Sequence, residues 1–118
     1  MIFKPELLAK ILDGTKAITR RRLPCRYQVD HWYTVQPGRG KKHVCHIFLT
    51  KVREERLGDI NYSQAGREGF SLRSDFVKYW YRIHGAYDPD ERVAVIEWVV
   101  YPAVKDCCDK AKEIKELR

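Results

Sequence analysis

Two segments with the composition of β-strands lie close together in the sequence and constrain the fold more than any other feature. Residues 32–36 and 44–52 are rich in β-branched and aromatic side chains, which favour strands. The connection between them carries strand breakers and three cations, in the order Pro37-Gly38-Arg39-Gly40-Lys41-Lys42. Because proline and glycine favour tight turns, we expect a long antiparallel hairpin with a basic tip. Residues 92–100 have the same character and would supply a further strand.

An amphipathic helix is predicted over residues 4–13, where Pro5 suits the first helical position. Apolar side chains recur at helical spacing and form one face, made of Leu7, Leu8, Ile11 and Leu12. Gly14 follows at the place where a left-handed residue would end the helix. A short extended segment, residues 17–19, is expected to come next.

Two further helices are predicted in the middle of the chain. Asn61 and Gln64 have the spacing of a capping box, which predicts a helix over residues 62–67. Ser71 is expected to cap a longer helix that ends at His84 and is closed by the glycine that follows. The apolar face of this helix is expected to pack in the core rather than to stack on bases, and it consists of Phe76, Trp80 and Ile83.

The order of these elements predicts an α+β fold, a small β-barrel with flanking helices. The length of 118 residues suits one domain, which we assign to residues 1–101. Residues 102–118 carry an amphipathic stripe and are expected to form a C-terminal helical extension. No apolar run is long enough to cross a bilayer, and no signal-peptide pattern is present. We therefore expect a cytoplasmic protein without membrane contact, either a monomer or a small homo-oligomer.

The positive charge of the chain is concentrated in its first half. The net charge is +7, and residues 16–56 contain eleven Lys or Arg against three Asp or Glu. This excess suits a polyanionic partner such as RNA. A solvated basic face is an equally valid interpretation of such a cluster.

The cysteine pattern gives little indication of a metal site. The four cysteines form no Cys-x-x-Cys motif, and Cys107 and Cys108 are adjacent, which is awkward for two ligands of one zinc ion. A zinc site that uses Cys45 with His46 or His31 is a minor alternative. We expect reduced thiols and no metal or other cofactor.

Chemistry is most concentrated in the segment that follows the first helix. Within a few residues it carries Lys16, the hydroxyl of Thr19 and two arginines, Arg20 and Arg21. A threonine hydroxyl needs a base to become a nucleophile, and a lysine whose pKa is lowered by burial and nearby cations can be that base. Residues three apart in a regular strand face opposite ways. Lys16 and Thr19 can therefore converge only if Lys16 lies in the turn after Gly14.

Several stretches together resemble the ASCH domain family. The helix Leu8-Ala9-Lys10-Ile11-Leu12-Asp13-Gly14, with Thr15-Lys16-Ala17-Ile18-Thr19-Arg20-Arg21 after it, is similar to the family pattern of a helix followed by Gly-x-Lys-x-x-x-x-Arg. Further similar stretches are Leu57-Gly58-Asp59-Ile60, Glu68-Gly69-Phe70 with Phe76 and Trp80, and Val93-Ala94-Val95-Ile96-Glu97-Trp98. The resemblance covers roughly residues 2–100 and implies a PUA-like fold, which is associated with RNA binding.

One branch of this family, the small bacterial amidohydrolases, is similar to the chain in length. These enzymes remove the acetyl group from N(4)-acetylcytidine, and the resemblance implies a catalytic set of Lys16, Thr19 and Glu68. Arg21 matches the motif arginine, and we expect Arg20 and Arg39 to help bind substrate. Threonine at position 19, where many ASCH proteins carry glutamate, favours the amidohydrolase. The alternatives are a non-catalytic RNA-binding module and an ASCH-type ribonuclease.

Overall fold

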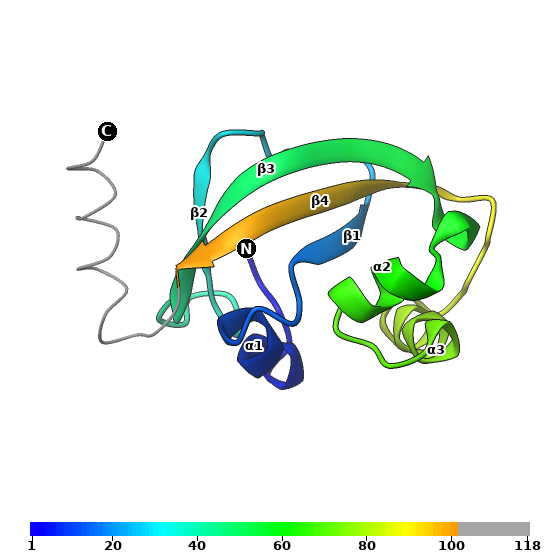
Figure 1. The fold of residues 1–118 in the computed structure, drawn as a ribbon, viewed down its shortest axis with the longest axis horizontal. Helices are drawn as coiled ribbons and strands as arrows, with labels where there is room; N and C mark the ends of the chain where they lie inside the picture. Colours follow the sequence, from blue (N-terminus) through cyan, green and yellow to red (C-terminus); the bar gives the residue numbers. More distant parts are fainter. Residues whose placement is uncertain (102–118) are drawn as a thin grey trace.

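The computed structural model describes residues 1–101 (Figure 1). The expected helix over residues 102–118 lies outside the described residues. The elements follow in the order α1 (Pro5–Leu12), β1 (Ile18–Arg22), β2 (Trp32–Val35), β3 (Cys45–Arg56), the 3-10 turn η1 (Leu57–Asp59), α2 (Tyr62–Arg67), α3 (Arg73–His84) and β4 (Arg92–Tyr101). The expected α+β class is thereby confirmed.

All four strands form one antiparallel sheet in the order β1-β4-β3-β2, so that the two long strands lie in its centre. The predicted hairpin is present, with Trp32 opposite Phe48 and Val35 opposite Cys45. The strands β3 and β4 bend along their length, and the helices lie on the concave side of the sheet (Figure 1). This curvature is the open, barrel-like shape expected of a PUA-like fold.

The strand β3 is longer than the sequence suggests, because it continues through four charged residues beyond Val52. These residues pair with the first half of β4, from Arg53 opposite Val95 to Arg56 opposite Arg92. Pairing with an apolar neighbouring strand, rather than the composition of the segment itself, makes this part extended. Glu55 is thereby carried onto the sheet.

The helix ends confirm most of the predicted caps. Asn61 and Gln64 form the reciprocal bonds of a capping box at the start of α2. Gly85 ends α3 in the left-handed conformation, with φ 75°. The prediction that Ser71 caps α3 is wrong, because the extended residue before the helix is Leu72 and no side chain caps it.

Two groups of buried side chains form the core. One lies between α1 and the sheet and includes Ile11, Ile47 and Trp98. The other lies under α2 and α3 and includes Phe76 and Trp80, which confirms their predicted packing. Ile83 was expected on the same face but is 39% exposed, because it lines the open cavity described below.

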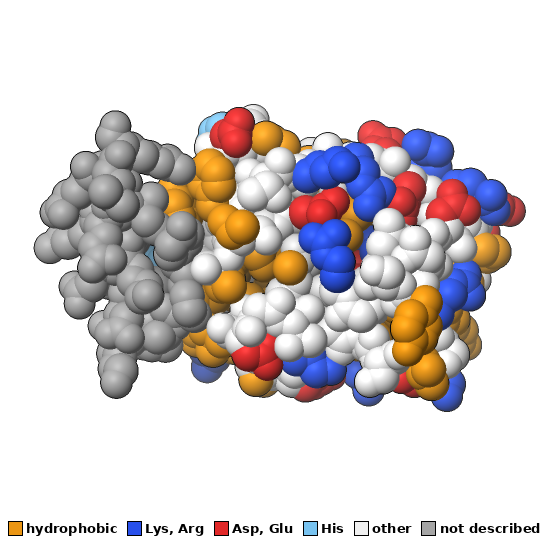
Figure 2. All heavy atoms as spheres, in the orientation of Figure 1, with side chains coloured by type: hydrophobic (Ala, Val, Ile, Leu, Met, Phe, Trp, Pro, Cys, Tyr) orange, Lys and Arg blue, Asp and Glu red, His pale blue; other side chains and the backbone are white. Residues whose placement is uncertain are grey.

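The charges of residues 16–56 do not form a uniform basic face. Four arginines of this segment make ion pairs with carboxylates: Arg20, Arg22, Arg53 and Arg56. On the face shown in Figure 2, basic and acidic side chains lie beside one another, and hydrophobic side chains gather toward the end of the sheet where β4 finishes. Within residues 1–101, no helix is both long and apolar enough to span a membrane.

Candidate functional site

The turn after α1 brings Lys16 to the start of β1. Gly14 has φ 86°, which a glycine adopts without strain, and it directs the chain away from the helix. The backbone N–H of Lys16 then donates to the carbonyl of Lys10 at 2.9 Å, and Ala17 donates to Arg67 at 2.8 Å. Lys16 therefore lies in the turn and not in the strand. This position meets the condition for convergence with Thr19, and both side chains line one cavity.

The amine of Lys16 is buried and has an acceptor for each of its three protons. Its Nζ donates to the carbonyl of Ile18 at 2.9 Å, to the carbonyl of Glu68 at 2.9 Å and to Oε1 of Glu68 at 3.1 Å. The residue is 2% exposed, and Glu68 is equally buried. Glu68 is therefore not an exposed loop carboxylate but the ion-pair partner of a buried lysine.

A tight turn at the end of α2 places Glu68 in this position. Glu68 is the C-terminal cap of α2, and Gly69 follows with φ 99°. A Cβ at Gly69 would lie 3.1 Å from Cδ of Lys10 and 3.6 Å from Cβ of Lys16. Lys10 in turn donates its Nζ to the carbonyl of Gly69. The turn thus packs directly on α1 and on the segment that carries Lys16.

Arg20 connects Glu68 to the sheet. Its Nη1 donates to Oε2 of Glu68 at 2.8 Å, and its Nη2 donates to Gln64 at 2.8 Å and to Glu55. The side chain of Arg20 is fully buried, so these contacts are made away from water. Two cations and two carboxylates, Lys16, Arg20, Glu68 and Glu55, therefore balance one another in charge.

Burial and neighbouring charges shift two pKa values in this group. Desolvation lowers the pKa of Lys16, the charge and hydrogen bond of Glu68 oppose this, and the charges of Arg21 and Arg20 add to the lowering. The net pKa of Lys16 lies below the usual lysine value. For Glu55, burial acts to raise the pKa, but hydrogen bonds from Arg20 and Arg53 outweigh it and lower the pKa.

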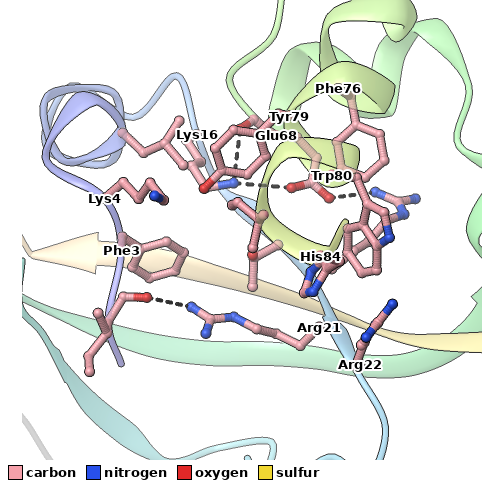
Figure 3. A pocket seen from close by; sticks show the side chains of 15 residues that line it. Phe3, Lys4, Lys16, Arg21, Arg22, Glu68, Phe76, Tyr79, Trp80 and His84 are labelled. Carbon is pink, nitrogen blue, oxygen red and sulfur yellow. Dashed lines mark hydrogen bonds and ion pairs between the residues drawn. The ribbon is translucent and has the colours of Figure 1, made fainter. Parts of the chain in front are cut away.

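The cavity beside this group has a volume of about 260 Å³. Figure 3 shows Lys16, Glu68 and Arg21 around it, together with aromatic side chains from the N-terminal segment and from α3. Five of the six predicted site residues line it: Lys16, Thr19, Arg20, Arg21 and Glu68. The sixth, Arg39, lies in the connection between β2 and β3 and does not line this cavity.

Sequence reasoning missed several contributors to the site. Phe3, Tyr79 and His84 line the cavity, and Glu55 holds Arg20 from outside it. Burial, the charge of Arg22 and the charge of Arg21 lower the pKa of His84, although Glu91 opposes them. Tyr79 and His84 lie three and four positions after the predicted core residues Phe76 and Trp80. That spacing around one helical turn is a signal that could have identified them.

Two buried nitrogens near the cavity have no hydrogen-bond partner within residues 1–101, Nε of Arg20 and Nε1 of Trp80. Both residues line the cavity. A buried donor without a partner costs free energy, so a polar ligand that reached these nitrogens would recover it. No cluster of three His, Cys, Asp or Glu that could hold a metal ion occurs in residues 1–101.

The fold is that of an ASCH domain, a mixed α+β domain of PUA-like type. The ASCH protein of Zymomonas mobilis superposes with a TM-score of 0.61 at 18% identity, over 83% of this chain and 64% of that one. The protein EF3133 of Enterococcus faecalis gives 0.65 at 14% identity, over 83% and 71%, and the ASCH domain of Lactobacillus crispatus gives 0.61 at 19%, over 80% and 70%. The chain thus spans somewhat less than two thirds of the Zymomonas protein. No protein-family model and no curated protein matches the sequence.

Proposed function

We propose that the chain is an amidohydrolase that removes the acyl group from N(4)-acetylcytidine or a related N(4)-acylated cytosine nucleoside. The observation that carries the proposal is a buried lysine of lowered pKa that lines the same cavity as a threonine hydroxyl. A lysine of this kind can act as general base toward a hydroxyl nucleophile. The ASCH fold supports the reaction class by resemblance, and the residues supply the chemistry.

Lys16 must be neutral to act as the base. Its protonated amine has one acceptor for each of three N–H groups. After loss of one proton, two N–H groups remain for three acceptors, and the amine must rotate so that its lone pair points to the hydroxyl of Thr19. Because burial lowers the pKa of Lys16, this neutral form is reached at a lower pH than for an exposed lysine.

In the first half of the reaction, Thr19 would lose its hydroxyl proton to Lys16 while its Oγ bonds to the carbonyl carbon of the acyl group. The carbonyl oxygen becomes an anion, and the cations that line the cavity, Lys4 among them, would stabilise it. When the C–N bond breaks, the proton on Lys16 passes to the departing N4 nitrogen. The products of this half are cytidine and an acyl ester on Thr19.

In the second half, water would attack the ester carbonyl and give its proton to neutral Lys16. The Thr19 oxygen then leaves, takes that proton back and releases the acyl group as a carboxylic acid, which ionises in water. Both carboxylate oxygens of Glu68 already accept hydrogen bonds, one from Lys16 and one from Arg20. For this reason we assign Glu68 the role of positioning Lys16, in preference to the role of a base that activates water.

The cavity suits a small, partly aromatic ligand. Its volume of about 260 Å³ lies just below the roughly 300–1,000 Å³ of pockets for drug-sized ligands. The rings of Phe3, Phe76, Tyr79 and Trp80 line it, and aromatic walls of this kind can hold a pyrimidine by stacking or edge contacts.

The test is turnover of N(4)-acetylcytidine in the presence of a chelator, with cytidine measured by chromatography. We expect the wild type to form cytidine and Lys16→Ala and Thr19→Val to lose about 100-fold or more, the typical contribution of such groups. Lys51→Ala and Thr50→Ala are matched controls, because both residues are exposed in β3 outside the cavity. Mass spectrometry should detect the acyl ester on Thr19. Full activity in Lys16→Ala or Thr19→Val would disprove the proposed mechanism.

RNA binding without catalysis is the second candidate. The tip between β2 and β3 carries Arg39, Lys41 and Lys42, which make no ion pairs within residues 1–101. A module of this kind would bind RNA with an affinity that falls steeply as salt rises. An ASCH-type ribonuclease would instead cleave RNA in nuclease-free preparations and lose this activity in Lys16→Ala. Lack of turnover combined with salt-sensitive binding would favour the RNA-binding module.

A further inference from the structure

Another hollow adjoins the cavity at the end of β1. It has a volume of about 190 Å³ and is lined by Arg21, Arg22, Pro24, Cys25, Arg26 and Tyr27. Arg21 and Arg22 also line the cavity described above, so the two hollows meet at these arginines. We infer that this hollow binds the phosphate of a nucleotide whose base occupies the cavity, so that the substrate is a nucleotide rather than a neutral nucleoside.

The charge of the hollow is positive and only partly compensated. None of its lining residues is acidic. Arg22 makes an ion pair with Glu91 at 3.2 Å, in which both side chains are partly exposed. Arg21 and Arg26 make no ion pair with any carboxylate of residues 1–101. Two guanidinium groups therefore keep their full charge beside the cavity.

The position of Arg21 is fixed before any ligand binds. Its Nη2 donates to the carbonyl of Ile2 at 2.8 Å, and its guanidinium lies 4.9 Å from the centre of the Phe3 ring. Figure 3 shows the side chain extending from β1 toward the N-terminal segment, with its contact to that carbonyl. These contacts occupy one N–H group and one face of the Arg21 guanidinium, and its remaining N–H donors stay available to a ligand.

Phosphate is the ligand chemistry that such a group recognises. A guanidinium presents its donors in a planar fork that matches phosphate oxygens, and the resulting hydrogen bonds are charge-assisted. The aromatic cavity next to it would hold the base, so base and phosphate would each have a separate place. The nucleotide specificity rests on the proposed function, since the same cavity would hold the acylated cytosine.

Binding of the reaction product tests the phosphate site without any need for catalysis. Titration calorimetry would compare cytidine, cytidine 5′-monophosphate, cytidine 3′-monophosphate and the dinucleotide CpC. We expect at least one phosphorylated form to bind about tenfold or more tightly than cytidine, as one or two charge-assisted hydrogen bonds would give. This advantage should shrink as salt rises. The form that binds most tightly distinguishes a terminal phosphate from a phosphodiester of RNA.

A pair of variants separates this site from general electrostatic attraction. Arg26→Ala removes a cation that lines the second hollow only, and Lys42→Ala removes one that lines neither hollow. Both side chains are exposed, so neither variant should unfold the domain. We expect the preference for the phosphorylated ligand to fall severalfold in Arg26→Ala and to persist in Lys42→Ala. Equal binding of cytidine and all phosphorylated forms, or an undiminished preference in Arg26→Ala, would overturn the inference.

Turnover distinguishes this inference from the proposed function. If the protein deacylates N(4)-acetylcytidine and its phosphorylated forms with equal kcat/KM and binds them equally, the amidohydrolase stands and the phosphate site fails. If nothing is deacylated but the phosphorylated products bind preferentially through Arg26, the phosphate site stands and the amidohydrolase fails.

Discussion

Replacement of Glu68 by glutamine should destabilise the domain strongly while changing its shape very little. Glu68 contacts Lys16 at 3.1 Å and Arg20 at 2.8 Å, and all three side chains are almost completely buried. Glutamine keeps the size of the side chain but leaves two buried cations with one carboxylate, Glu55, in place of two. Loss of one partner of a buried ion pair costs about 3–5 kcal/mol of unfolding free energy. For a domain of this size that is a fall in Tm of roughly 10 °C or more.

The loss of stability in Glu68→Gln should also depend on pH, in a direction set by the pKa of Lys16. The pKa of Lys16 is lowered in the folded state, so unfolding takes up a proton and stability rises with pH toward the ordinary lysine value. Because Glu68 raises the pKa of Lys16, Glu68→Gln lowers it further and widens this range. We therefore expect the deficit of the variant to shrink as the pH rises through the folded-state pKa of Lys16, and never to be larger at pH 9 than at pH 7.

Urea denaturation followed by circular dichroism at both pH values measures this deficit. Glu6→Gln is the matched control, because Glu6 pairs with Arg82 at 3.0 Å with both side chains more than half exposed. Exposed pairs contribute about 1 kcal/mol or less, so the control should unfold close to the wild type. A Glu68→Gln variant within about 1 kcal/mol of the wild type at pH 7 would refute the reasoning, since it would mean that the two cations do not need this carboxylate.

Three further predictions concern the base, the turn and a cap. The kcat/KM for N(4)-acetylcytidine should rise with pH around a midpoint below the usual lysine pKa. Arg21→Gln should move this midpoint upward, because the charge of Arg21 lowers the pKa of Lys16. A pH–rate profile with an unmoved midpoint would contradict this prediction. Gly69→Ala should destabilise the domain by about 1–2 kcal/mol, because φ is 99° and the new Cβ would meet Lys10. Gly66→Ala has open space around it in α2 and should stabilise the domain by about 0.5–1 kcal/mol. Thermal melts that rank the two variants the other way would count against this prediction. Asn61→Ala should lower the free energy of unfolding by about 1 kcal/mol through loss of the capping box. Urea denaturation midpoints measure this change, and an unchanged midpoint would show that the cap contributes nothing.

Local signals in the sequence were sufficient for the elements whose ends depend on their own residues. The capping box at Asn61, the glycine that closes α3 and the turn between the hairpin strands act over a few residues. The prediction of Ser71 as a cap failed because serine is favoured both at caps and in bends, and only the path of the chain decides between them. The end of β3 depends on pairing with β4, which lies about 40 residues further along the chain.

In the candidate site, too, local features could be predicted from the sequence and long-range contacts could not. The segment around Lys16 and Thr19 was proposed from residue types, and the turn after Gly14 places Lys16 outside the strand, so that both residues line one cavity. Glu55 could not be identified, since its contact with Arg20 spans 35 residues and depends on the register of the sheet. Arg39 was predicted from charge alone, and charge does not determine where a loop lies.

The charged groups of the site belong to a longer chain of ion pairs that alternates in sign from the cavity to the surface. Beyond Glu55 it continues through Arg53 and Glu97 to Arg67, whose side chain is 47% exposed. The charges that shift the pKa of Lys16 are those of Glu68, Arg21 and Arg20, so a substitution at Arg67 would change only the surface end of this series of ion pairs. For the buried ion pairs near the cavity, charged residues should be replaced in compensating pairs. Replacing a single charged residue by a neutral one would leave its ion-pair partner with an unbalanced charge.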